Sequence, residues 1–266
     1  MNPPSEPAAA ASRRPVTPAT IAEESYRAAA AVIAAERTPA GVARMVREAV
    51  AWFERVWTAI RGQVEAKGPP FACRAGCAWC CNQIVTIAPA EAIAIAQHVR
   101  ATFSADDLAA LKSRLVSLDD RARGLGAFAR GLLKTPCAFL VDGACSVYEV
   151  RPVRCRGVMS RDVGHCRWVA ENPDLVYAWR DRLLPTNPYP PEPGVIADAV
   201  LSGIATAARD AGLAFTALEL VAALRIALDT PDIAERYLAG EPVFAAAARP
   251  ASADAGLPPH MVQAAP

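Results

Sequence analysis

The sequence has little of several features that would narrow its function. Its 266 residues contain no uncharged apolar run of about 18 residues, the length that a membrane-spanning helix needs. Lysine and arginine total 28 against 27 aspartates and glutamates, so the net charge of +1 gives no reason to expect nucleic acid as a partner. There is also no glycine-rich nucleotide loop. We therefore expect neither a membrane protein nor a nucleic-acid-binding protein.

The first residues also lack the apolar segment of a secretory signal. Arg13–Arg14 resembles a twin-arginine signal, but prolines and then Glu23 and Glu24 follow where a continuous apolar run should be. We expect a cytoplasmic protein. Because thiols stay reduced there, cysteines would serve as metal ligands or redox groups and not as disulfides.

The chain does have eight cysteines, in two groups of four. Residues 73–81 read Cys-Arg-Ala-Gly-Cys-Ala-Trp-Cys-Cys, and the second group lies within one later stretch of thirty residues that is rich in loop signals. Lone cysteines that act as small hydrophobes would be scattered along the chain. The grouping therefore favours a fold built around bound metal. The eight candidate ligands are Cys73, Cys77, Cys80, Cys81, Cys137, Cys145, Cys155 and Cys166.

Helix signals dominate the rest of the sequence. We expect a mainly α-helical fold: a single domain over residues 19–245 that carries the cysteine-rich core at 73–166. Hydrophobic residues make up 53% of the chain, which is enough for a packed core. Residues 1–18 and 246–266 are expected to be disordered. Strands and helices do not alternate, which argues against a Rossmann or thioredoxin sheet.

Individual helices are predicted from their end signals. Thr38–Pro39 is an N-cap pair for a helix that stops at Gly68, and Pro89 opens another. Ser104 with Asp107 resembles a capping box. Three further helices are expected near 195–210, 216–228 and 231–239, the last two begun by a capping box at Thr216–Glu219 and an N-cap pair at Thr230–Pro231, with Gly240 as the final stop.

Two short extended segments are predicted. Residues 84–87 follow the first cysteine group, and residues 138–148 contain the Asp142–Gly143 pair that is typical of a tight hairpin. A two-residue loop would place Cys137 and Cys145 on opposite faces of the hairpin, whereas one bulged residue would place them on the same face. The sequence does not decide between these.

The spacing of the thiols leaves the metal open. Thiolates bind zinc and iron strongly, and Gly76 allows the chain to turn around an ion. Cys80 and Cys81 are neighbours whose side chains point apart in extended backbone, so they suit two ions or a multinuclear centre. Eight thiols could form two zinc sites, one iron–sulfur cluster with spare thiols, or one cluster with one zinc. The ferredoxin spacings do not match.

Three side features carry weaker hypotheses. Cys77–Ala–Trp–Cys80 is a C-x-x-C motif, but it lacks the βαβ context of thiol–disulfide exchange. His165, next to Cys166, could replace a thiol, although a supporting or surface role fits it better, and His98 sits in a predicted helix without an acidic or thiol neighbour.

Arginines crowd both groups. They could balance thiolate charge or line a pocket for an anionic ligand. They are Arg74, Arg151, Arg154, Arg156, Arg161 and Arg167.

The cysteine pattern resembles a known family. Cys73-x3-Cys77-x2-Cys80-Cys81, then Cys137-Ala-Phe-Leu, then Cys145 with the string Tyr148-Glu-Val-Arg-Pro-Val-Arg-Cys155-Arg, is similar to the CxxCxxCC (YkgJ-type) cysteine-cluster family of zinc- or iron-chelating proteins. The first two cysteines are separated by three residues here, where the family has two.

The resemblance implies metal binding by all eight cysteines and implies no reaction. A related cluster occurs in flagellin lysine N-methylase, so a metalloenzyme, for example a protein-modifying methylase-like enzyme with an anionic substrate near the arginines, is the alternative. We expect a metal-binding protein that holds zinc or an iron–sulfur cluster, with a metal ion as its partner.

Overall fold

The computed structural model describes residues 15–175 and 188–248. It is mainly α-helical, as predicted, with two small two-stranded sheets in the described part. Most of the termini predicted to be disordered lies outside the described residues. Their described parts are residues 15–18 and 246–248, and both include ordered structure. Helix α1 (Pro18–Ala35) begins at Pro18. Ala247 is buried in a short 3-10 turn, η3 (Ala245–Ala247).

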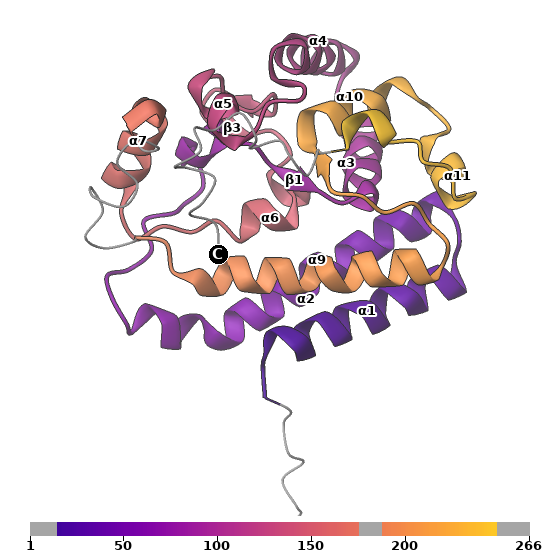
Figure 1. The fold of residues 1–266 in the computed structure, drawn as a ribbon, viewed down its shortest axis with the longest axis horizontal. Helices are drawn as coiled ribbons and strands as arrows, with labels where there is room; N and C mark the ends of the chain where they lie inside the picture. Colours follow the sequence, from indigo (N-terminus) through magenta and orange to yellow (C-terminus); the bar gives the residue numbers. More distant parts are fainter. Residues whose placement is uncertain (1–14, 176–187, 249–266) are drawn as a thin grey trace, which may run out of the picture.

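Three long helices form one side of the molecule. Helix α1, α2 (Pro39–Glu65) and α9 (Pro191–Asp210) lie side by side along the lower part of Figure 1. Thr38 caps α2 as predicted, its Oγ1 accepting a hydrogen bond from Gly41 N at 3.1 Å. Helix α1 was not predicted individually. Ser25 Oγ donates to Val200 O at 2.8 Å, which fixes α1 against α9.

Shorter helices cover the other side. Helices α3 (Pro89–Thr102) and α4 (Ala105–Ala122) begin where their end signals predicted, with Ser104 Oγ accepting from Asp107 N at 3.1 Å. Helix α10 (Leu220–Asp229) packs on both. Helix α11 (Ile233–Leu238) ends just before the predicted Gly240 stop, and the short α5 (Ala127–Leu132) follows α4 along the chain.

Two predicted helix starts are wrong. Thr216 begins no helix, because residues 218–219 instead form strand β4 (Leu218–Glu219), antiparallel to β1 (Thr86–Ile87). Glu219 itself caps α10, its Oε2 accepting from Ala222 N at 2.9 Å. Thr230 opens a turn, and α11 begins three residues later. The pairing of β1 with β4 is a long-range contact that end signals cannot report.

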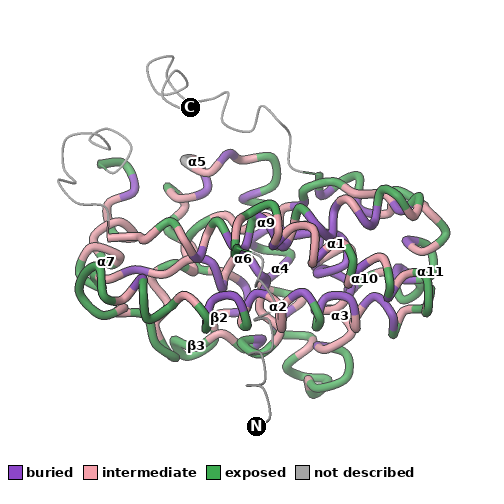
Figure 2. Tube along the Cα trace, turned by 90° about the horizontal axis from the view of Figure 1, so that it is seen from below, coloured by how far each residue is buried: buried purple, intermediate pink, exposed green. Residues whose placement is uncertain are grey.

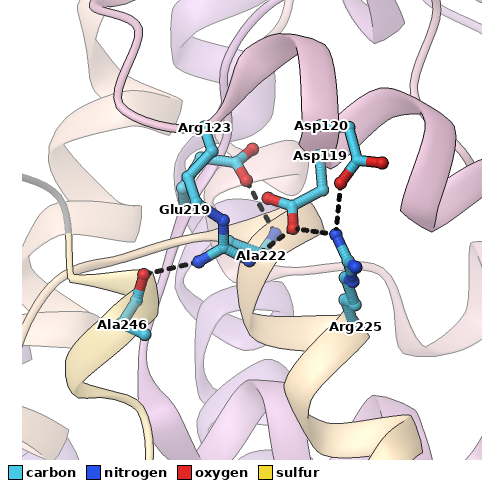
Figure 3. Close-up of polar contacts among 7 residues, drawn as sticks. All are labelled: Asp119, Asp120, Arg123, Glu219, Ala222, Arg225 and Ala246. Atoms are coloured by element: carbon cyan, nitrogen blue, oxygen red, sulfur yellow. Dashed lines mark hydrogen bonds and ion pairs between the residues drawn. The ribbon is translucent and has the colours of Figure 1, made fainter.

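A charge network holds α4, α10 and η3 together (Figure 3). Asp119 of α4 is fully buried, and its Oδ2 accepts from Arg123 and, at 2.9 Å, from Arg225 of α10. Arg123 also donates to Ala246 O at 2.6 Å, and Arg225 to Asp120 at 2.6 Å. Because one buried carboxylate accepts from two elements, the network fixes the position of α10 relative to α4.

The short elements that carry or adjoin the cysteines lie at one end of this helical core. They are η1 (Trp79–Asn82), β2 (Leu140–Val141), β3 (Ala144–Cys145), η2 (Tyr148–Val150), α6 (Val153–Arg156) and α7 (Val163–Glu171). Buried residues concentrate in the long helices, whereas the region around β3 and α7 is mostly intermediate or exposed (Figure 2). Among residues 15–175 and 188–248, none of the helices combines the length and apolar character that a membrane crossing requires.

Candidate metal centre

The fold brings the two cysteine groups together. The backbone N–H of Cys137 donates to the carbonyl of Cys81 at 2.7 Å. The N–H of Ser160 donates to Cys73 Sγ at 3.2 Å, and Ser160 O accepts from Ala72 N at 2.9 Å. Residues that are more than fifty positions apart in sequence are therefore in direct contact. The two groups therefore meet in space, as a fold built around bound metal requires, and all eight cysteines are free thiols.

The first group is arranged by a tight turn followed by a 3-10 helix. Gly76 has φ +81°, a left-handed conformation that favours glycine, and Cys77 N donates to Arg74 O at 3.1 Å. Cys80 and Cys81 then lie in η1 and not in the extended backbone that the sequence argument assumed. A 3-10 helix has three residues per turn, so neighbouring side chains leave it about 120° apart. The Cys80 and Cys81 thiols nevertheless lie close enough to hydrogen-bond with each other.

The hairpin is confirmed and needs no bulge. Leu140 pairs with Cys145 and Val141 with Ala144, while Asp142 and Gly143 both have positive φ, the arrangement of a type I′ turn. Cys137 precedes the two-residue strand and lies in a turn, with Leu140 N donating to Cys137 O at 2.9 Å. Strand alternation therefore does not apply to Cys137, and both cysteines of this part reach the same cavity.

Two neighbouring cavities divide the thiols. The larger has a volume of about 440 Å³ and the smaller about 20 Å³. Cys166 lines only the smaller cavity, whereas Cys81, Cys137, Cys145 and Cys155 line only the larger. The remaining three, Cys73, Cys77 and Cys80, line both. All eight candidate ligands thus lie around one continuous region at the end of the helical core.

The thiols surround these cavities without converging on one point. In residues 15–175 and 188–248, no three Cys, His, Asp or Glu side chains stand in metal-binding geometry. Burial raises the pKa of Cys137 to about 11 and that of Cys155 well above its ordinary value. The hydrogen bond to Cys81, followed by desolvation, raises the pKa of Cys80.

The donor set nevertheless suits zinc or iron, because these metals bind thiolate sulfur strongly. The raised pKa values mean that the thiols of Cys80, Cys137 and Cys155 carry protons near neutral pH. An arriving ion must displace those protons and draw the sulfurs inward, so binding is coupled to proton release. The residues present therefore fit a metal by their chemistry and by their grouping.

Glu91 is a site residue that sequence reasoning missed. It is 1% exposed on α3, and its two carboxylate oxygens accept from Ala88 N and Val153 N, both at 2.8 Å. Val153 is the first residue of α6, which carries Cys155 and Arg156. The buried carboxylate thus anchors the helical turn that presents one of the thiols. The only signal in the sequence was a glutamate two residues after Pro89, which indicates a capped helix start and no tertiary role.

The predicted arginines have different roles. Arg154 pairs with Asp198, and Arg167 with Glu171 at 2.8 Å, and neither lines a cavity. Arg161 donates to Pro69 O and Val64 O, which ties the end of α2 to the loop before α7.

Arg156 is buried, pairs with Glu54 at 2.8 Å and donates to Glu149 O at 2.5 Å. Arg151 lies 3.8 Å from the ring centroid of Tyr148. Arg74, Arg151 and Arg156 line the larger cavity.

Of the histidines, His165 lines neither cavity; its ring packs edge-on against Tyr189 at 5.5 Å. Tyr189 itself was not predicted. Its hydroxyl lies 3.4 Å from Cys166 Sγ, and it lines the smaller cavity. His98 lies within α3 and away from both cavities, as expected.

Comparison with known proteins agrees with the cysteine pattern. Residues 72–174, which contain all eight cysteines, match the CxxCxxCC family model, described as a "Putative zinc- or iron-chelating domain". The resemblance drawn from the cysteine motif is thereby confirmed for this segment, and zinc or iron chelation is the function that the family model supports. No curated protein and no solved structure matched the chain.

Proposed function

We propose that this protein chelates metal through its eight cysteines at two centres. The observation that carries the proposal is the division of the thiols between two adjoining cavities, which separates Cys166 from Cys81, Cys137, Cys145 and Cys155. Four thiolates make a closed tetrahedral site of the kind that structural zinc uses. Eight thiols suffice for two such sets.

The smaller centre is assigned to Cys73, Cys77, Cys80 and Cys166. These are the only cysteines that line the smaller cavity, whose volume of about 20 Å³ suits a single ion and not a cluster. The adjacent pair then belongs to different centres: Cys80, which lines both cavities, to the smaller, and Cys81, which lines only the larger cavity, to the larger.

The larger centre is assigned to Cys81, Cys137, Cys145 and Cys155. Its cavity has room for either a zinc ion or an iron–sulfur cluster, both of which are bound by four thiolates. The thiols come from four separate elements, which only the native fold brings together. Binding at this centre should therefore contribute to folding. The proposal includes a reducing, cytoplasmic setting, in which the thiols stay available.

A second candidate function is a metalloenzyme. The larger cavity extends past the sulfurs and is lined by Arg74, Arg151 and Arg156. A catalytic metal needs an accessible position beside groups that hold a substrate. We favour chelation without catalysis, because Arg154 and Arg156 pair with carboxylates, and Glu54, the one carboxylate among the described residues that line the larger cavity, is the partner of Arg156.

The two centres can be tested by removing one ligand at a time. Cys166→Ser should lower the metal content to that of the larger centre alone, and Cys145→Ser to that of the smaller centre alone. The double variant should lose both. Elemental analysis of anaerobically purified protein measures this, with Ser146→Ala, which removes a hydroxyl beside Cys145, as the matched control. Equal and complete metal loss in both single variants would show one shared centre instead of two.

A further inference from the structure

The larger cavity is bigger than its metal centre requires. Its volume of about 440 Å³ falls in the range of small-molecule pockets, roughly 300–1,000 Å³. Seven cysteines, four of them assigned to the larger centre, occupy one part of its wall, and the rest of the wall includes α2, the loop after α2, η2 and residues 158–159. Space beyond the sulfurs is therefore available to a second ligand.

The wall away from the sulfurs is largely aromatic and apolar. Trp57 and Phe71 meet edge to face, with ring centroids 5.5 Å apart, and Met159 and Val158 extend this surface. Tyr148 is 46% exposed and lies where the cavity meets solvent. Aromatic walls of this kind bind flat apolar groups, and ring pairs add about 0.5–1.5 kcal/mol beyond the burial of area. The shape of the ligand that fits best is thus a flat ring.

The charge of the cavity is positive apart from the thiols. Its lining includes four arginines, Arg61, Arg74, Arg151 and Arg156, and a single carboxylate, Glu54, which is paired with Arg156. Arg61 is paired with Glu65 at 2.8 Å outside the lining. Arg74 and Arg151 pair with no carboxylate among the described residues, so an anion entering the cavity would meet positive charge that only the thiols offset; Arg151 acts electrostatically on Cys80 and Cys145.

Arg151 is the arginine that is free to bind it. One face of its guanidinium stacks on the Tyr148 ring at 3.8 Å, which fixes its orientation. Its Nη1 is buried and finds no hydrogen-bond partner within residues 15–175 and 188–248. Arg156, in contrast, donates from Nε, Nη1 and Nη2 to protein acceptors. A buried guanidinium N–H without an acceptor is costly unless a ligand supplies one.

We propose that the larger cavity binds a small aromatic carboxylate, with the ring packed against the Trp57–Phe71 pair and the carboxylate on Arg151. The inference rests on the proposed metal function only in that the ligand would lie beside the larger centre. A guanidinium and a carboxylate form charge-assisted hydrogen bonds, which are stronger than neutral ones. A neutral ring that carries a carbonyl group can accept a hydrogen bond from Arg151 Nη1, but without the added strength of the charge.

The test is a calorimetric titration of the full-length, metal-loaded protein with benzoate, and with benzamide as the neutral analogue. Benzoate should bind and benzamide should bind at least about tenfold more weakly. Arg151→Gln should weaken benzoate binding about tenfold or more, and Arg151→Lys should fall between. Arg154→Gln is the matched control, because Arg154 lies three residues away and outside the cavity, and its titration should equal that of the native protein.

Metal content is measured on every variant, so that the two proposals fail separately. The ligand site is overturned if metal-loaded protein does not bind benzoate, or if Arg151→Gln binds benzoate as tightly as the native protein does. Either result leaves metal chelation standing. Loss of metal in both Arg151→Gln and Arg151→Lys would assign Arg151 to the metal centre and also overturn the ligand site. Benzoate binding that depends on Arg151 in a protein without zinc or iron would support the pocket and contradict chelation.

Discussion

At the scale of single residues, the cysteines carried most of the information in the sequence. Their grouping predicted the metal centre, and the adjacency of Cys80 and Cys81 predicted that the two thiols diverge. The structure instead has a 3-10 turn at this pair, and the two thiols lie close enough to hydrogen-bond with each other. Which thiols share a cavity could not be predicted, because Cys166 reaches its partners through the fold of α7 against η1.

The residue that sequence reasoning missed, Glu91, gives a test at the same scale. Glu91→Gln keeps the shape of the side chain, but its amide group can accept from only one of the two N–H groups that Glu91 now satisfies. We expect a loss of about 1–3 kcal/mol in the free energy of unfolding near pH 5. Urea unfolding followed by circular dichroism measures it, and Glu48→Gln on the exposed face of α2 is the control, with no change expected.

The pH dependence of this loss has a definite sign. Burial raises the pKa of Glu91 above its ordinary value of 4.5. The native state therefore holds the proton more tightly than the unfolded state. The stabilisation that Glu91 contributes to the native state is therefore complete below about pH 4.5 and declines as the pH rises through the raised pKa of Glu91. The difference in unfolding free energy between the native protein and Glu91→Gln should narrow as the pH rises above about 5 and through the raised pKa of Glu91. If the difference in unfolding free energy between the native protein and Glu91→Gln grew as the pH rose, the raised pKa of Glu91 would be contradicted.

At the scale of elements, local signals succeeded where an element begins or ends by local chemistry. Thr38, Pro89 and Ser104 start helices as predicted, and Asp142–Gly143 turns the hairpin. Local signals failed where contact with a distant segment decides the conformation. Residues 218–219 pair with β1, more than a hundred residues earlier, and this pairing moves the start of α10 past Thr216.

Substitutions can measure whether Glu219 or Thr216 caps α10. Because Glu219 caps α10, Glu219→Ala should lower the free energy of unfolding by about 1 kcal/mol. Thr216 is exposed outside the helix, so Thr216→Ala should change it by less than about 0.5 kcal/mol. Glu219→Gln keeps an oxygen acceptor for Ala222 N and should recover most of the loss. Thermal or urea unfolding of the three variants provides the comparison, and a larger effect at Thr216 would restore the capping box as first predicted.

At the scale of the whole molecule, the sequence predicted a mainly helical chain and no tertiary arrangement. The close packing of α1 on α9 and the two adjoining cavities depend on contacts between residues far apart in the chain. We propose that residues 19–245 fold as one domain, because α2 and α9 contact elements from both halves of the sequence.

Since the larger centre joins four separate elements, removing metal should destabilise the molecule as a whole. We expect a strong chelator to lower Tm by at least about 5 °C, on the scale of 2–4 °C per kcal/mol for a chain of this size. Differential scanning calorimetry measures the shift. The variant that carries both Cys145→Ser and Cys166→Ser should show no further response to the chelator. Complete metal loss without a change in Tm would place the metal at the periphery of the fold.

The most direct test of metal chelation is the metal content of the protein as purified without oxygen, measured by elemental analysis together with the visible spectrum. The account predicts zinc or iron in an amount that fills both centres. Colourless protein with zinc would indicate two tetrathiolate sites, and broad absorption near about 400 nm would indicate an iron–sulfur cluster at the larger centre. Protein that folds and contains neither zinc nor iron would contradict the account.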